Sequence, residues 1–199
     1  MFHYLEGTVT IIGQNLAVVD IGGAGYACMT TMNTLSRLEV GKKARLFTYC
    51  NVKEDAFDIY GFYDISEKRC FELLLGVSGV GPKAALSILS SATPESLAMA
   101  IVSDDETALT IAPGIGKKLA QRIMLELKDK VSKETAAMKS DGYSPPRGGD
   151  AQPGSKQRDA AAALAVLGYT QGEISAAMRG LDISGLTVEE IIREVLSNH

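Results

Sequence analysis

The chain has 199 residues, of which 46% are hydrophobic, so it can form one medium domain or two to three small ones with buried cores. No uncharged apolar run reaches the roughly 18 residues of a membrane span, and the N-terminus lacks the pattern of a secretory signal, so we expect a cytoplasmic protein without a membrane contact. The net charge of -4 does not favour nucleic-acid binding, although basic residues concentrate toward the end of the segment 64–139.

Residues 1–63 have the pattern of short strands, because runs rich in β-branched and aromatic residues alternate with glycine-rich turns. About five strands, with a short helical interruption near residues 33–38, predict a small Greek-key barrel of the OB type. A small β-sandwich is the alternative. In the last run, Phe57 and Ile59 alternate with polar neighbours, which predicts a strand with one buried face.

Two groups of side chains are expected to be structural. Tyr49, Phe57 and Tyr60 are predicted to lie in the core of the barrel rather than on its surface. Cys28, Cys50 and Cys70 are odd in number and widely spaced, which fits neither a disulfide framework nor a zinc site. We therefore expect three reduced thiols.

The period becomes helical from residue 64 onward. Thr93 before Pro94 predicts a helix start, because a threonine hydroxyl caps free amides and proline suits the first helical position. Ser103 with Glu106 predicts a capping box for the next helix. Residues 140–155 contain four glycines and three prolines, which is typical of a flexible linker.

The last segment, residues 156–199, has the pattern of three short helices. Thr170 with Glu173 and Thr187 with Glu190 predict capping boxes for the second and third helix. Gly168 is expected to end the first helix in a left-handed conformation. One apolar face is predicted for the last helix, formed by Val188, Ile191, Ile192, Val195 and Leu196.

One motif occurs twice. SGVGPKAALSIL returns 35 positions later as PGIGKKLAQRIM, and helical stretches flank each copy, so the repeated unit is a helix–hairpin–helix. Glycines two apart allow a tight turn and bring bare backbone amides to the surface, beside the positive end of the following helix. Each hairpin is therefore a predicted phosphate-binding site. The shift places Gly79 on Gly114, Gly81 on Gly116 and Lys83 on Lys118.

A single glycine hairpin is an ordinary tight loop about as often as it is a phosphate-binding site. Two copies in register, each with a basic residue at the same offset, favour DNA binding. Two hairpins related by pseudo-twofold symmetry can hold both strands of a duplex across a groove. Such contacts reach phosphates and carry no base sequence, so we expect structure-selective binding. The predicted DNA-binding residues are Gly79, Gly81, Lys83, Gly114, Gly116, Lys117, Lys118 and Arg122.

The paired hairpins resemble those of the RuvA family, and the resemblance covers essentially the whole chain. It includes the segment Lys53-Glu54-Asp55-Ala56 leading into Tyr60-Gly61-Phe62, and Leu167-Gly168-Tyr169 in the tail. The resemblance implies an α+β multidomain chain. Its parts would be a barrel for oligomerisation (1–63), a helical DNA-binding domain with tandem hairpins (64–139), a flexible linker (140–155) and a three-helix domain that binds the RuvB motor (156–199).

The resemblance also implies a function in recombination and DNA repair. A homotetramer would hold an open four-way (Holliday) junction and recruit RuvB, while RuvC resolvase would act through the shared junction. Glu54 and Asp55 match the family's acidic pin at the junction centre. Four apolar tail residues match positions associated with the motor contact, although each could equally belong to the core: Leu164, Leu167, Tyr169 and Leu196.

The sequence contains no phosphate loop of the type that binds ATP, so we expect no catalytic site and no cofactor, with ATP used by the partner motor. His3 and His199 lie at opposite ends, and no cluster has metal-ligand spacing. The alternative is a DNA repair enzyme with helix–hairpin–helix units, a glycosylase or a nuclease. Its only dense acidic run would be 104–106, which is better suited to cap a helix. A single-strand-binding OB protein would need exposed stacking aromatics.

Overall fold

The computed structural model describes residues 1–138, 154–179, 181, 183 and 185–197. The linker predicted at 140–155 lies, except for its last two residues, outside this part. Two compact units are formed, and the predicted boundary after residue 63 does not separate them, so the division into domains stays a prediction. The first unit comprises Met1–Gly76, Val80–Thr93 and Ala112–Gly114, and the second comprises Val77–Gly79, Pro94–Ile111 and Ile115–His199.

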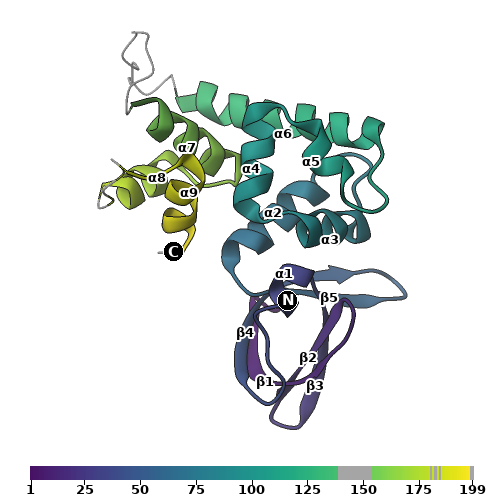
Figure 1. Cartoon of the computed structure of the whole chain (residues 1–199). Coiled ribbons are helices and arrows are strands. Elements are labelled where there is room, and N and C mark those ends of the chain that lie inside the picture. Colours follow the sequence, from purple (N-terminus) through teal and green to yellow (C-terminus); the bar gives the residue numbers. More distant parts are fainter. Residues whose placement is uncertain (139–153, 180, 182, 184, 198–199) are drawn as a thin grey trace. The chain divides into compact units, whose positions relative to one another are not determined.

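Five strands of the first unit close into a barrel in the order β1-β2-β3-β5-β4 (Figure 1). Neighbouring strands pair antiparallel except β3 and β5, which pair parallel. Helix α1 (Met32–Leu35) connects β3 to β4, close to the predicted interruption. The OB-like barrel is thereby confirmed over a sandwich. The strands are β1 (Tyr4–Ile12), β2 (Leu16–Ile21), β3 (Ala24–Met29), β4 (Lys43–Val52) and β5 (Phe57–Phe62).

The barrel interior is filled by small and aliphatic side chains that alternate inward along the strands. Val9, Ala17, Val19 and Cys28 are at most 1% exposed. Burial raises the pKa of the Cys28 thiol to about 12, and the nearby Cys50 thiol adds to this shift. All three cysteines are free thiols, as predicted, and all three are buried.

Strand β5 departs from the predicted alternation of one buried and one open face. Ile59 and Tyr60 are both buried, whereas Phe57 is 53% exposed, so the prediction that Phe57 belongs to the core is wrong. Strand β3 pairs only with Ile59 and Tyr60, which leaves Phe57 on a two-stranded extension of β4 and β5. Tyr60 is buried because Phe71 of α2 (Ile65–Leu75) covers it, with ring centroids 5.1 Å apart.

A buried carboxylate joins α1 to α2. Glu67 is 2% exposed and accepts hydrogen bonds from the hydroxyls of Thr31 and Thr34. Burial raises the pKa of Glu67, and the two threonine hydrogen bonds only partly oppose this shift. Asp64 caps α2 by accepting from the Glu67 amide at 2.8 Å. These bonds fix the start of α2 against the barrel.

Four further helices carry the repeated motif. Helix α4 begins at Pro94 directly after Thr93, as predicted. The predicted capping box of Ser103 and Glu106 is wrong, because Ser103 is the last residue of α4. Helix α5 is capped by Asp105, whose carboxylate is a stronger acceptor than a hydroxyl. The helices are α3 (Pro82–Ser91), α4 (Pro94–Ser103), α5 (Glu106–Thr110) and α6 (Lys117–Met138).

No described helix alone is long and apolar enough to cross a membrane, and only α3 and α4, taken together across a bend, pass that test.

The tail forms three helices, as predicted: α7 (Gly154–Val166), α8 (Gln171–Met178) and α9 (Val188–Ser197). Both capping boxes are confirmed, because the amides of Thr170 and Thr187 each donate to a glutamate three residues on at 2.8 Å. Gly168 follows α7 with φ 79°, in the predicted left-handed conformation. The predicted face of α9 is buried at Ile191, Ile192, Val195 and Leu196, while Val188 is half-buried.

Candidate nucleic-acid interface

The two glycine hairpins adopt the same backbone conformation. Gly79 has φ 87° and Gly114 has φ 83°, a left-handed region that glycine enters without strain. The residue after each of these glycines, Val80 or Ile115, is at most 6% exposed and anchors its loop in the core. Because the apolar residue points inward, the glycines on either side lie at the surface. The sequence repeat is therefore also a structural repeat.

The second glycine of each hairpin presents bare backbone at a helix start. Gly81 caps α3 without a side-chain bond, and the Gly116 carbonyl accepts the first amide bonds of α6. A Cβ added at Gly81 or Gly116 would meet no atom within 4 Å. Neither amide donates a hydrogen bond to the described residues. Both amides are open to an anion, and the dipole of the following helix favours negative charge there.

Exposed lysines flank these amides. Lys83 on α3 and Lys118 on α6 occupy equivalent positions of the repeat, and Lys117 precedes Lys118. Among the described residues, no carboxylate forms an ion pair with any of the three. Their charge is therefore available to a polyanion such as a nucleic-acid backbone.

Two equivalent hydrogen bonds brace the hairpins. Within the first unit, the Ser87 hydroxyl donates to the carbonyl of Pro113 at 2.7 Å. Within the second, Nη1 of Arg122 donates to the carbonyl of Ser78 at 3.3 Å. Ser87 and Arg122 are 35 positions apart, as are Ser78 and Pro113, so each bond is the repeat-related copy of the other. Each hairpin is thus braced by the equivalent residue of the repeat, and Arg122 has a bracing role besides its predicted charge contact.

One further residue takes part in this bracing, and it is not among the residues predicted from the sequence. The Glu126 carboxylate on α6 accepts a hydrogen bond from the backbone amide of Ser78 at 3.2 Å. Glu126 lies four residues after Arg122, so both side chains share one helix face, and they bind the backbone amide and carbonyl of the same residue, Ser78. That spacing is the signal that sequence reasoning missed.

The predicted acidic pin lies at the tip of the β4–β5 hairpin. Glu54 and Asp55 are both exposed, and the Lys53 amide closes the turn by donating to the Ala56 carbonyl at 2.8 Å. The hairpin projects from the barrel wall (Figure 1). The two carboxylates are thus held in solvent at the end of a regular two-stranded arm, and their position at a junction centre stays a prediction.

The four tail residues of the predicted motor contact belong to the core of the tail. They are at most 9% exposed, so in this structure they offer little surface to a partner. The predicted contact therefore stays a prediction, and burial favours an indirect role through the shape of the tail. The residues are Leu164, Leu167, Tyr169 and Leu196.

The dense acidic run at 104–106 is used structurally. Asp104 forms an ion pair with Lys128 at 2.6 Å, and Asp105 caps α5, where hydrogen bonds from Thr107 lower the pKa of its carboxyl. Glu106 accepts from the Gln121 amide group at 3.2 Å. In the described part of the chain, no three His, Cys, Asp or Glu side chains gather as metal ligands would.

Comparison with known proteins places these features in one family. Three family models match the chain in order: RuvA N terminal domain over residues 1–61, SAM-like Helix-hairpin-helix tandem over 71–129, and RuvA, C-terminal domain over 155–198. A relative from Ruminiclostridium cellulolyticum, named Holliday junction branch migration complex subunit RuvA, is 40% identical over 199 residues and covers 100% of both chains. The chain belongs to the RuvA family.

Other members of the RuvA family match over nearly the same length. The relative from Acetivibrio thermocellus is 40% identical over 197 residues, which is 98% of this chain and 97% of its own. The relative from Caldanaerobacter subterraneus subsp. tengcongensis is 42% identical over the same shares. Both are also named Holliday junction branch migration complex subunit RuvA. DNA binding and recombination follow from membership of this family, and the hairpins are the part of this chain suited to the binding.

Proposed function

We propose that this chain binds four-way (Holliday) junctions by their structure and holds them for branch migration. The observation that carries the proposal is the pair of hairpins whose bracing bonds repeat 35 residues apart. Each hairpin suits one sugar-phosphate backbone, so the pair suits both strands of a duplex arm. Backbone amides and lysines contact phosphates and carry no base sequence. The relatives are named as subunits of a Holliday junction branch migration complex, which supports the same function.

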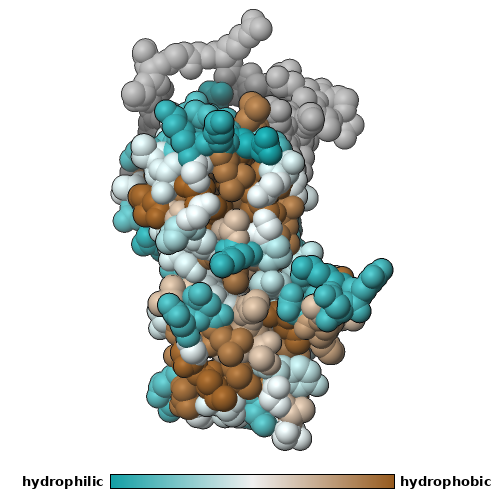
Figure 2. Space-filling model, turned by 90° about the vertical axis from the view of Figure 1, so that its right-hand side faces the viewer, coloured by the Kyte–Doolittle hydropathy of each residue, from teal (hydrophilic) through white to brown (hydrophobic). Residues whose placement is uncertain are grey.

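A homotetramer would supply one such pair of hairpins for each arm of a junction. Among the residues whose burial the structure describes, eleven of the thirteen exposed large hydrophobic side chains lie in residues 1–63, which supports the barrel as the oligomerisation domain. Figure 2 shows a hydrophobic patch on the barrel. Exposed apolar surface of this kind is stabilised when copies of a chain cover it.

The acidic pin would act at the centre of such a tetramer. Two unit charges 4 Å apart repel by roughly 4 kcal/mol at an effective dielectric constant of about 20, so Glu54 and Asp55 do not attract phosphates. We assign them the role of keeping the backbones apart at the crossover. An open junction would thereby be favoured over a stacked one.

The tail would recruit RuvB, the ATP-driven motor, while RuvC would act through the shared junction. This chain would be a non-catalytic subunit of the helicase complex, with no cofactor of its own, in the cytoplasm. The alternative of a repair glycosylase or nuclease is less favoured. Asp104, Asp105 and Glu106, its candidate carboxylates, are each engaged in a separate structural contact.

A competition experiment tests the proposal. A labelled four-way junction is bound by the chain and challenged with unlabelled junctions of unrelated sequence and with linear duplex of equal length. We expect the unrelated junctions to compete equally and the duplex to compete weakly at moderate salt, because only backbone arrangement is recognised. Equal competition by linear duplex would overturn the proposal.

A further inference from the structure

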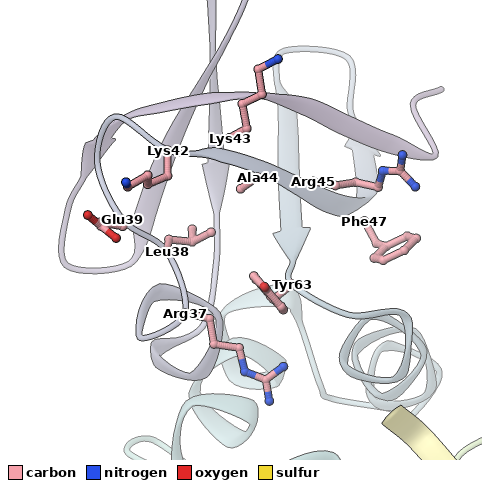
Figure 3. A pocket seen from close by; sticks show the side chains of 9 residues that line it. All are labelled: Arg37, Leu38, Glu39, Lys42, Lys43, Ala44, Arg45, Phe47 and Tyr63. Atoms are coloured by element: carbon pink, nitrogen blue, oxygen red, sulfur yellow. The ribbon is translucent and has the colours of Figure 1, made fainter. Parts of the chain in front are cut away.

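A second basic site lies in the first compact unit, on the barrel. A pocket of about 380 Å³ is formed by the segment between α1 and β4, the start of β4 and the end of β5 (Figure 3). Residues 1–63 contain five lysines and arginines, and four of them line this pocket. Glu39 is the only acidic residue of the lining. The four are Arg37, Lys42, Lys43 and Arg45, and we call the site the barrel pocket.

The two arginines of the barrel pocket are fixed by neighbours but remain accessible. Arg37 pairs with Asp64 at 2.8 Å and lies over the ring of Tyr63, at 5.2 Å from its centroid. Arg45 pairs with Glu6 at 2.6 Å. The arginine side chains are 54% and 53% exposed. Their guanidinium groups keep donors available after one ion pair, because each has five.

The two lysines carry uncompensated charge. Lys42 and Lys43 are exposed, and neither forms an ion pair with a carboxylate of the described residues. Figure 3 shows the four basic side chains leaving the pocket in different directions. A single small anion would need converging donors, whereas an extended polyanion can contact cations that are spread around a rim.

The barrel is also polarised along β4. Lys43 begins this strand, and the acidic pin follows its end. Ten residues of strand at roughly 3.3 Å each separate the two by about 30 Å. A backbone of phosphates is thus attracted at one end of the strand and repelled at the other.

We propose that the barrel pocket binds phosphates of the DNA backbone, mainly through Lys42 and Lys43, as a contact additional to the glycine hairpins. The proposal rests on the proposed function only in taking DNA as the ligand. The proposed contact requires neither a junction nor a particular base sequence, because the lysine side chains would contact only phosphates.

The experiment measures the salt dependence of DNA binding by the full-length chain. The double variant Lys42→Gln, Lys43→Gln is titrated with a four-way junction and with linear duplex between 50 and 200 mM salt. Two lost phosphate contacts flatten the slope of log affinity against log salt by about 1.8, so the ratio of wild-type to variant affinity shrinks by about tenfold over this range. Lys156→Gln with Arg158→Gln, two exposed tail residues, is the matched control and should keep the wild-type slope. An unchanged slope in the pocket variant would overturn the proposal.

Two further variants keep the outcome decisive. Lys42→Arg with Lys43→Arg retains the charges and should restore the slope. Glu39→Gln removes the single acid of the pocket and should tighten binding by about twofold at low salt. If the variant Lys42→Gln, Lys43→Gln misfolds or changes oligomeric state, the DNA affinity of Glu39→Gln tests the proposal instead. An unchanged DNA affinity of Glu39→Gln would then mean that the pocket contacts other copies of this chain and not DNA. Equal wild-type affinity for junction and duplex would instead refute the proposed function, while the duplex slope would still test the pocket.

Discussion

Replacing the second glycine of a hairpin with alanine should weaken DNA binding while the protein stays folded. Gly116 has open space where a Cβ would stand, and its backbone is not among the left-handed positions, so alanine fits without a clash or strain. Loss of glycine at the helix cap costs about 1 kcal/mol of unfolding free energy at most. The added methyl would block the approach of a phosphate to the amide. A hydrogen bond to a charged group contributes about 1.5–3 kcal/mol, so we expect junction affinity to fall about 10- to 150-fold.

The comparison with a lysine variant makes this prediction sharper. Lys118→Ala removes one exposed, screened charge, which contributes about 0.2–1 kcal/mol and weakens binding by less than about sixfold. Affinity is measured by fluorescence anisotropy with a labelled four-way junction, and stability by urea unfolding. Gly185→Ala, in the tail, adds a methyl in equally open space and should change neither. The backbone cradle would be refuted if Gly116→Ala bound within twofold of wild type while Lys118→Ala bound more weakly.

Four further changes test other parts of the structure. Neutralising the pin with Glu54→Gln and Asp55→Asn should leave junction affinity equal or higher and should reduce the preference for junction over duplex, as measured in paired titrations. A clear loss of junction binding in a folded oligomer would contradict the repulsive role. Leu164→Ala truncates a side chain with 0% exposure and should destabilise the tail by about 2–5 kcal/mol, reducing motor-driven branch migration but not junction binding. Because folding raises the pKa of Glu67, the folded state binds the proton more tightly, so the contribution of Glu67 to the unfolding free energy is largest below the ordinary value of 4.5 and falls as pH rises; Glu67→Gln should remove this contribution in urea titrations at several pH values. Glu126→Ala frees the Ser78 amide and should weaken junction binding by loosening the first hairpin, and unchanged affinity would show that Arg122 alone suffices.

The sequence was most informative where a local rule decides the structure. The glycine repeat, the capping boxes at Thr170 and Thr187 and the end of α7 at Gly168 each depend on a few neighbouring residues. Ser103 was misassigned because it has the spacing of a capping box with Glu106, three residues on, although Ser103 is still inside α4. The residue that caps α5 is Asp105.

The features that sequence reasoning missed depend on tertiary structure. Phe57 was assigned to the core because alternation does not show where a strand leaves its barrel. The bond of Ser87 to Pro113 crosses 26 residues, and that of Arg122 to Ser78 crosses 44. The barrel pocket was likewise hidden, because an overall balance of charge in residues 1–63 conceals how four cations gather at one site.

Hydroxyl-radical footprinting of a four-way junction bound to the wild-type chain tests the central claim most directly. The account predicts protection of the sugar-phosphate backbone on both strands of all four arms, in the same pattern for two junctions of unrelated sequence. It also predicts that Gly81→Ala with Gly116→Ala removes this protection, because both open amides are then blocked. Protection confined to one arm, or a pattern that follows the base sequence, would contradict it.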